Sequence, residues 1–559
     1  MKNTLLIFLS HLCLTQISFA QKNDKPDYHS PLGIPQVLAA NFGELRPNHF
    51  HMGIDLKTNG RIGYNLYAVE EGFVSRIKVS PYGYGKVVYI DHPNGITSVY
   101  AHCSAFKDQL DSIVRHTQQN EQDFAVEIFP KKNEIKVTKG QIIAISGNTG
   151  GSTAPHLHFE LRDTKTETAL NPLVYGFNIA DSRRPEIRGV KIYSLTKDGY
   201  RFDKSIKRST IKNGVSYTVY NNSITIPSNY LTKSGGLGFA FDVIDRLDAA
   251  NNTCGLYGSY LLINGDTLFG QETNRVPFES TRFVNSHKDY NEYSLNRKKF
   301  HKSFRTTENN LPIYTVKGLG VLKAKPGDYF KVKYVCYDPK GNTSILTFNL
   351  IISNGIVSSK DSIATDLGYL QPSESMLVEQ NKTHVEFGIC TTYEPLSIDE
   401  KHIESKIGEA NIPVQNAYRI NIIYDGLKDG KHYIDMTTGK GSKKALNVTY
   451  EDRLITCESN YFGSYKLKRD TIAPNITAIN IGNSTTRTSL SWQIYDDGSG
   501  LKDYDLFIND NWHLAEYEYK TGRLTFTREK NLKGIMGLEL KIVDNCGNIN
   551  MWRKTVEFN

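Results

Sequence analysis

The chain has 559 residues, of which 39% are hydrophobic and 23% are charged, and a formal net charge of +8. This length exceeds what one hydrophobic core supports, so two to four domains are expected, and the composition is that of a folded protein rather than a disordered one. The small positive charge comes without a dense Lys/Arg block or interleaved basic and aromatic residues, so nucleic acid is not an expected partner.

The N-terminus has the layout of a cleavable secretory signal. Lys2 precedes an apolar run from Thr4 to Phe19, and Ala20 ends this run before a polar stretch. The layout predicts residues 1–20 as a signal peptide and an exported protein, located in the periplasm, the cell envelope or the medium. No later stretch has the about 20 apolar residues that span a bilayer, so no transmembrane segment is expected.

Six of the seven cysteines lie beyond the predicted signal, at wide spacings and without a Cys-x-x-Cys pair. Export permits disulfides, and Cys390 and Cys457 fall in one predicted region. A disulfide between these two residues and free buried thiols are the two alternatives.

Residues 32–172 have the pattern of strands with one helical insertion. Tyr (33) and Gly (44) are abundant in the chain, a mix that favours strands and tight turns. A Pro-Asn-Gly turn at 93–95 predicts a hairpin, and Phe106, Leu110 and Ile113 recur at helical spacing. The predicted strands cover residues 65–69, 72–79, 86–91, 96–102, 124–129 and 141–146, and the predicted helix covers 106–120.

After about residue 180 short strands and Asp/Asn/Gly turns recur with an internal echo. The turn from Asp338 to Asn342 resembles the turn from Asp544 to Asn548, and a last strand follows each. Such units favour β-sandwich modules, so the expected chain is mostly β. The predicted regions are 21–180, an Ig-like β-sandwich region at 181–357, a β-rich module at 358–470 with a linker at 465–474, and a C-terminal Ig-like β-sandwich at 471–559.

Two histidines lie two residues apart in an alternating run after a glycine-rich turn. In a strand, residues i and i+2 face the same side, so His156 and His158 would share one space. Leu157, Phe159 and Leu161 would then pack on the other side. Two imidazoles on one strand suit zinc, which takes nitrogen ligands at about 2.0–2.1 Å.

His49, His51 and Asp55 form a second cluster. In a straight strand the Cα atoms of His51 and Asp55 would lie roughly 13 Å apart, too far to share one metal ion. Gly53 lies between them and permits a bend. A His49–His51 pair is the alternative, and the residues alone leave the ligand set open.

Three short motifs follow one another in the first region. They are His51-Met52-Gly53-Ile54-Asp55, Tyr100-Ala101-His102 and His156-Leu157-His158-Phe159-Glu160. Together they resemble the LytM/lysostaphin-type M23 zinc metallopeptidases, which carry His-x-x-x-Asp, Tyr-x-His and His-x-His-Phe-Glu in this order. The resemblance covers about residues 40–175. It implies that region 21–180 is an M23-type antiparallel β-sheet catalytic domain with a short helical insertion.

The resemblance also implies a role for each matched residue. His51, Asp55 and His158 would bind one zinc ion per chain, while His156 and His102 would stay uncoordinated. Zinc lowers the pKa of bound water towards about 7, and His156 would act as the general base. His102 would orient the water or stabilise the developing oxyanion.

Other parts of the first region match the family less closely. Residues 106–133 form an insertion where shorter members of the family have a brief connection. The insertion would form one side of the substrate groove, act as a lid, or be a surface segment without a role in the site. The run Tyr82-Gly83-Tyr84-Gly85 would supply groove contacts or form a simple turn. The histidines without a matching motif are interpreted as structural or surface residues: His49, His92 and His116.

The resemblance and the predicted signal imply an exported zinc metalloendopeptidase that hydrolyses peptide bonds in peptidoglycan stem peptides or cross-links. The alternatives are a non-catalytic M23-like protein that binds the wall or regulates a hydrolase, and an endopeptidase with a protein substrate. For the C-terminal modules we predict binding to wall or envelope components, or positioning of the enzyme, because the sequence shows no second ligand cluster there. A purely spacing role is the alternative.

Overall fold

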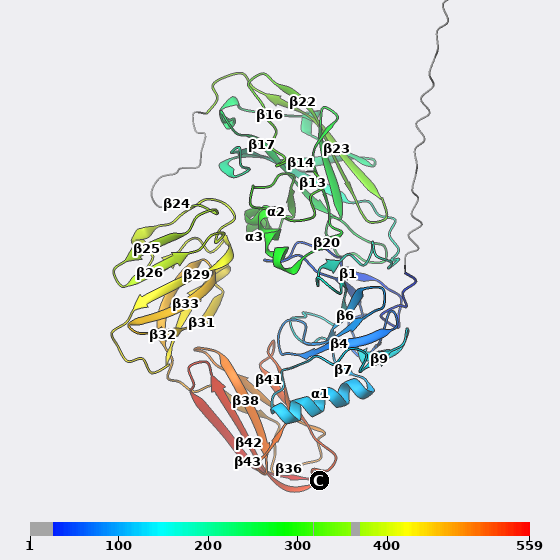
Figure 1. The fold of residues 1–559 in the computed structure, drawn as a ribbon, viewed down its shortest axis with the longest axis vertical. Coiled ribbons are helices and arrows are strands. Elements are labelled where there is room, and N and C mark those ends of the chain that lie inside the picture. Colours follow the sequence, from blue (N-terminus) through cyan, green and yellow to red (C-terminus); the bar gives the residue numbers. More distant parts are fainter. Residues whose placement is uncertain (1–25, 317, 359–368) are drawn as a thin grey trace, which may run out of the picture.

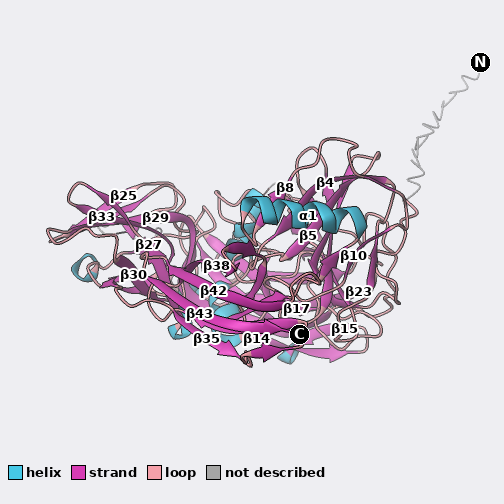
Figure 2. Cartoon of the chain, turned by 90° about the horizontal axis from the view of Figure 1, so that it is seen from below, coloured by secondary structure: helices cyan, strands magenta, loops and turns pink. Residues whose placement is uncertain are grey.

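The computed structural model describes residues 26–316, 318–358 and 369–559, so the predicted signal peptide lies outside the described residues. The described chain is mostly β, with few helical segments between the strands (Figure 2). The longest helix in this part is α1 (Asp108–Glu121), which confirms the predicted helical insertion. None of the helices described is long and apolar enough to cross a membrane.

An antiparallel sheet forms the first region. Its strands are, in spatial order, β1 (Leu38–Ala40), β2 (Ile54–Lys57), β11 (His156–Asp163), β6 (Ile96–Cys103), β5 (Lys86–Asp91), β4 (Gly72–Val79) and β8 (Val126–Ile128). A smaller sheet contains β3 (Asn65–Tyr67), β10 (Ile142–Ile145) and β7 (Ala105–Phe106). The predicted strands are therefore confirmed, with small differences at their ends.

The alternation along β11 separates its two faces. Leu157, Phe159 and Leu161 are fully buried in the core of the first region, as a period of two residues predicts. His158 lies opposite Asp55 of β2 and Ala101 of β6. The strand with the histidine pair is thus flanked by the strands that carry or adjoin the other two motifs.

The described residues beyond the first region contain three large buried cores and one small cluster around Tyr193 and Phe304. Around the first large core in chain order are β13 (Glu186–Leu195), β14 (Arg201–Asn213), β17 (Gly236–Ile244), β18 (Gly258–Ile263), β22 (Tyr329–Tyr337) and β23 (Thr343–Ile352). The short helices α2 (Val284–His287) and α3 (Tyr290–Asn296) instead pack Val284 and Tyr293 against the core of the first region. Around the second large core are β26 (Thr383–Phe387), β29 (Pro413–Ile423), β30 (His432–Thr437), β33 (Leu454–Tyr461) and β34 (Gly463–Arg469). Around the third are β37 (Ser489–Tyr495), β38 (Leu501–Ile508), β40 (Ala515–Glu518), β41 (Arg523–Thr527), β42 (Gly534–Asp544) and β43 (Ile549–Phe558). In the last two, residues of two sheets share one core, as in a β-sandwich.

The repeated turn has the same structure at both places. Asp338 accepts hydrogen bonds from the backbone and side-chain N–H groups of Asn342, and Asp544 accepts the same pair from Asn548. The turns join β22 to β23 and β42 to β43, so the internal echo is confirmed. The predicted linker at 465–474 is wrong in its first half, because residues up to Arg469 belong to β34 and pair with β30. The boundaries of the regions stay a prediction.

The six described cysteines are all free thiols, and five of them are buried. Of the two alternatives for Cys390 and Cys457, the structure therefore contains the free thiols.

The chain runs round a circuit that closes on its first region (Figure 1). The regions follow one another from blue through green and yellow to red, and the last sandwich lies beside α1. Lys86 Nζ is 2.9 Å from Glu516 Oε2, and Gln119 Nε2 donates a hydrogen bond to Trp512 O at 3.3 Å. Tyr504 of the last sandwich packs against the core of the first region. The first region and the last sandwich are thus in direct contact.

The second region forms hydrogen bonds with the segment that precedes β2. Thr281 Oγ1 accepts a hydrogen bond from Phe50 N at 2.9 Å. The buried Lys288 donates to Arg46 O at 2.7 Å. The loop that carries the first motif is therefore held by contacts from the second region.

Candidate metal centre

Three side chains of the first region converge on one point. His51 Nε2 lies 3.0 Å from Asp55 Oδ1 and 3.1 Å from His158 Nδ1, and His158 Nδ1 lies 2.8 Å from Asp55 Oδ1. All three residues are buried and form a group that could hold a metal ion. A tetrahedral zinc ion with bonds of about 2.0–2.1 Å spaces its ligand atoms about 3.3 Å apart. Two imidazoles and a carboxylate at these distances fit zinc.

A bend at Gly53 brings the first two ligands together. His51 precedes β2 and Asp55 lies within it, and Met52 and Gly53 between them come before the strand. A Cβ atom on Gly53 would lie 2.4 Å from Phe159 O and 3.1 Å from His158 Cε1, so only glycine fits this approach. The alternative pair of His49 with His51 does not form, because His49 is exposed and its Nδ1 donates to Pro47 O.

Hydrogen bonds determine which nitrogen of each imidazole faces the centre. His51 Nδ1 donates to Asn41 O at 2.8 Å, which leaves the lone pair on Nε2. His158 Nε2 donates to Glu160 Oε1 at 2.8 Å, which leaves the lone pair on Nδ1. Outer partners of this kind orient the imidazoles of metal sites.

Glu160 is a buried carboxylate behind the centre. It accepts a hydrogen bond from Arg162 Nε at 2.7 Å and another from the Tyr84 hydroxyl. Burial by itself would raise the pKa of Glu160, but the Arg162 guanidinium and the bond from His158 lower it to about 2. The carboxylate is therefore charged and compensated, as a buried charge requires.

The electrostatic environment of the His51, Asp55 and His158 group favours a positive charge. Burial would raise the pKa of Asp55, but the imidazoles of His51, His156 and His158 outweigh burial and hold it well below its ordinary value. Burial would lower the pKa of His158, but its bonds to Asp55 and Glu160 raise it to about 9. Surroundings that favour a proton at this point also favour a cation that replaces the proton.

Two more imidazoles flank the three ligand candidates. His156 Nδ1 donates to Ala154 O at 2.8 Å, and its Nε2 lies 3.4 Å from Asp55 Oδ1. His102 Nδ1 donates to Thr149 O at 2.8 Å, and its ring lies 4.9 Å from that of His156. Burial and the neighbouring imidazoles lower the pKa of His102 to about 3, so it is neutral at pH 7. The structure thus brings all five predicted site residues together.

His102 has a left-handed backbone conformation with a φ of +61°. It lies near the end of β6, where the register with β5 shifts between Lys86 and Val88. Irregularities of this kind redirect side chains and are frequent beside functional sites. Nothing in the Tyr-Ala-His triplet signals this conformation.

A cavity of about 440 Å³ opens over the centre. Arg46 and Ser152 line it although the sequence analysis missed them. Arg46 Nη2 lies 3.4 Å from Asp55 Oδ2, and Ser152 Oγ lies 3.1 Å from His156 Nδ1. Their only signal in the sequence is closeness to the motifs.

The cavity also bears on the alternatives for two segments. Gly83 and Tyr84 line the cavity and also form the turn between β4 and β5, so both alternatives for the 82–85 run apply. His49, interpreted as structural or surface, is exposed and lies on the rim. The inserted residues 106–133 contribute no lining residue among those described, and α1 instead packs Leu110 and Val114 into the core.

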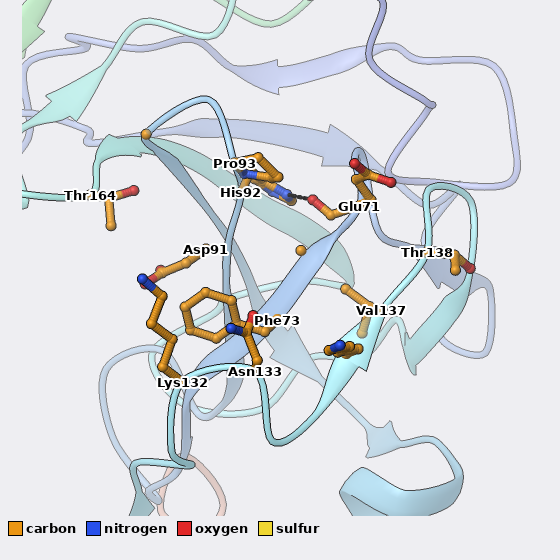
Figure 3. A pocket seen from close by; sticks show the side chains of 13 residues that line it. Glu71, Phe73, Asp91, His92, Pro93, Lys132, Asn133, Val137, Thr138 and Thr164 are labelled. Carbon is orange, nitrogen blue, oxygen red and sulfur yellow. Dashed lines mark hydrogen bonds between the residues drawn. The ribbon is translucent and has the colours of Figure 1, made fainter.

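A larger hollow of about 710 Å³ lies elsewhere on the same domain (Figure 3). The figure shows Phe73, Asp91 and Val137 around it, with His92 at one side. His92 pairs its Nδ1 with Glu71 O at 2.8 Å and its Nε2 with Ser98 Oγ at 2.7 Å. Both ring nitrogens are used within the fold, which agrees with a structural role for His92.

The expectation of no second ligand cluster in the C-terminal modules is wrong. Two groups of three carboxylates each lie close enough to hold a metal ion: Asp181, Asp245 and Asp338, and Asp470, Asp496 and Asp544. Each group includes the aspartate of the repeated turn. Their members are far apart in the sequence and meet only through the sheet topology. They contain no imidazole, unlike the centre in the first region.

The match to a family model lies in the first region. The model of peptidase family M23 matches residues 49–120 and 125–172. The DD-carboxypeptidase/endopeptidase Mpg of Neisseria meningitidis serogroup B is 33% identical over 112 residues, 20% of this chain and 20% of the relative. The peptidoglycan DD-endopeptidase ShyA of Vibrio cholerae serotype O1 is 35% identical over 100 residues, 18% of each chain. The matched part thus spans about a fifth of the length of these curated relatives.

Two solved structures are similar to about a quarter of the chain. The catalytic domain of the prophage-encoded M23 protein EnpA from Enterococcus faecalis is 27% identical and covers 26% of this chain and 95% of that one, with a TM-score of 0.20. The catalytic domain of lysostaphin from Staphylococcus simulans is 25% identical and covers 25% and 90%, with a TM-score of 0.19.

Fold, candidate centre and family match together define the first region as a domain of the metallopeptidase class. More narrowly, residues 49–120 and 125–172 match the model of peptidase family M23, and a C-terminal part that is also mostly β follows them.

Proposed function

We propose that the protein is an exported zinc metalloendopeptidase that hydrolyses peptide bonds in peptidoglycan stem peptides or cross-links. The observation that carries the proposal is the buried group of His51, Asp55 and His158, with the imidazoles of His102 and His156 beside it. The two relatives named for DD-endopeptidase activity support the substrate class. The signal-like N-terminus supports export.

His51 Nε2, His158 Nδ1 and Asp55 Oδ1 are the atoms that would hold the zinc ion. When bound, zinc supplies a Lewis acid that polarises the scissile carbonyl and lowers the pKa of water in the site. The hydrogen bonds from the ligand imidazoles to Asn41 O and Glu160 keep the two lone pairs directed at the ion.

His156 is assigned to proton transfer. Ala154 O engages its Nδ1–H, so the lone pair of Nε2 faces the centre. Nε2 would take the proton of the attacking water and deliver it to the leaving amine.

His102 is assigned to orientation of the water. Its Nδ1–H is engaged by Thr149 O, and with a pKa near 3 the ring is neutral at pH 7. Nε2 is then a hydrogen-bond acceptor. An acceptor can orient the O–H of water but cannot donate a hydrogen bond to an oxyanion. Of the two roles that the family resemblance implies for His102, orientation of the water is therefore favoured over stabilisation of the oxyanion.

The test is digestion of purified peptidoglycan, with the released fragments identified by mass spectrometry. We expect hydrolysis by the wild type and about one zinc ion per chain, and no hydrolysis by His158→Ala or in excess chelator. His116→Ala, an exposed histidine of α1, is the matched control and should behave as the wild type.

Full hydrolysis by His158→Ala or in excess chelator would refute the proposal. A protein that binds the wall but contains no zinc and cleaves nothing would favour the non-catalytic alternative. Cleavage of a protein but not of peptidoglycan would favour the alternative of an endopeptidase with a protein substrate.

We further propose that the C-terminal modules bind wall components or position the catalytic domain. Their contacts with the first region support positioning. Comparing wall binding by residues 181–559 and by the intact protein separates the two roles.

A further inference from the structure

The last sandwich reaches the rim of the candidate centre through one short segment, residues 516–520. Lys520 Nζ donates to two carbonyl oxygens of one turn of the first domain, Asn148 O at 2.6 Å and Ser152 O at 2.9 Å. A charged donor makes the stronger kind of hydrogen bond. Lys520 therefore ties together the two ends of the 148–152 turn.

The 148–152 turn bears directly on His156. Within the turn, Ser152 Oγ donates to Asn148 Oδ1 at 2.6 Å, and it lies 3.1 Å from His156 Nδ1. Ser152 is buried, so its hydroxyl has little freedom while the turn holds its position. A shift of the turn would change the surroundings of the nitrogen that orients the His156 ring.

The same segment also contacts a second loop beside the cavity, residues 82–86. Glu516 forms an ion pair with Lys86 at 2.9 Å, and the rings of Tyr519 and Tyr82 lie 5.0 Å apart. Between Tyr82 and Lys86 lies Tyr84, which lines the cavity. Residues 516–520 thus contact two loops that contribute lining residues to the cavity.

The two loops meet through glycines. Gly151 N donates to Gly83 O at 2.7 Å, and a Cβ atom on Gly150 would lie 2.3 Å from Gly85 N. Glycine allows this approach but gives the backbone more freedom than any other residue. Contacts from outside the two loops are therefore the means to restrict them.

Residues 516–520 border the cavity without filling it. Every residue that lines it belongs to the first domain. An inhibitory segment would occupy the space over the ligands, so the contact has the geometry of a brace.

We propose that residues 516–520 form a brace that completes the active site, with Lys520 and Glu516 as positioning residues. The brace restricts the 148–152 turn and the 82–86 loop, and through Ser152 it holds His156 in the orientation for proton transfer. Its catalytic consequence rests on the proposed function, whereas the brace itself does not.

The experiment uses the full mature chain with Lys520→Met, Glu516→Gln and the control Lys533→Met. The side chains of Lys520 and Glu516 are 23% and 47% exposed, so neither substitution disturbs a core. Lys533 is an exposed lysine of the same sandwich. Amide hydrogen exchange reports on the loops, and kcat, KM and zinc content report on the site.

We expect exchange at residues 148–152 to rise roughly tenfold in Lys520→Met, as loss of hydrogen bonds from a charged donor implies. Glu516→Gln should raise exchange at residues 82–86. In Lys520→Met, kcat should fall several-fold while KM and zinc content stay at their wild-type values. Lys533→Met should match the wild type in every measurement.

Unchanged exchange in Lys520→Met would overturn the brace, whether or not the protein hydrolyses peptidoglycan. Raised exchange with a wild-type kcat would overturn its link to His156, and a higher kcat would show an inhibitory contact instead. If the wild type fails to hydrolyse peptidoglycan, the proposed function falls, and the exchange data still decide the brace.

Discussion

Glu160 and Glu167 bind the same arginine, one in the core and one at the surface. Arg162 Nε lies 2.7 Å from Glu160 and its Nη1 lies 2.9 Å from Glu167, yet the two carboxylate side chains are 0% and 60% exposed. Glu160→Gln replaces one acceptor oxygen by an NH₂ group. The amide cannot accept from both Arg162 and His158, and the Arg162 charge loses its buried counter-ion.

The two substitutions should therefore differ greatly in effect. Removing one partner of a buried ion pair costs about 3–5 kcal/mol of unfolding free energy. Losing the outer partner of a metal-binding imidazole lowers metal affinity about 10–100-fold. Glu167→Gln breaks only an exposed pair, which is worth about 0.2–1 kcal/mol, and should leave zinc affinity unchanged.

Urea unfolding measures the stability of both variants, and competition with a chromophoric chelator measures their zinc affinity. Equal destabilisation by the two substitutions would show that burial of the Glu160–Arg162 pair does not matter. Wild-type zinc affinity in Glu160→Gln would refute its role as the outer partner of His158.

Three further outcomes are expected. Gly53→Ala places a Cβ atom 2.4 Å from a carbonyl oxygen of β11 and should lower the free energy of unfolding by about 1–3 kcal/mol. In the control Gly388→Ala the Cβ atom meets nothing within 4 Å. Equal temperatures of thermal unfolding in the two variants would contradict this reasoning. Burial and nearby carboxylates raise the pKa of Asp245 to about 8, so the folded state keeps a proton that the unfolded state loses above about 3.8. The gain in stability from Asp245→Asn, measured in urea, should therefore grow between pH 5 and pH 8, and a gain that shrinks would refute the reasoning. Burial would raise the pKa of Glu394, but Arg201 lowers it to about 2. Its contribution to the free energy of unfolding is therefore present above about pH 4.5 and is lost as the pH falls towards 2. In Glu394→Gln the free energy of unfolding should lack this part of its dependence on pH.

Local patterns predicted the parts of the site that local geometry determines. The period of two in β11 placed His156 and His158 on the face opposite the buried Leu157. Gly53 permitted the bend that joins His51 to Asp55, although only the structure showed that this bend forms. The family resemblance supplied what spacing left open, namely a division of the histidines into ligands and proton carriers, which stays a proposal.

The remaining features depend on contacts that no local pattern encodes. The left-handed backbone of His102 follows from a register shift between two strands, and a register is set by the whole sheet. Arg46 reaches the cavity because the loop before β2 folds back over Asp55. Lys520 contacts a turn 368 positions earlier, and an exposed lysine in a strand-rich module carries no mark of its partner.

The contact between the first region and the last sandwich affects the order in which parts of the chain reach their final structure. Lys86 and Glu516 are 430 positions apart, so their contact can form only after most of the chain has been synthesised. The first sheet can fold earlier from its own hairpins, while the rim of its cavity waits for the last sandwich. The intervening regions act as a tether that gives the two surfaces a high effective concentration. A single proteolytic cut in that tether would convert an intramolecular contact into one that dilution can separate.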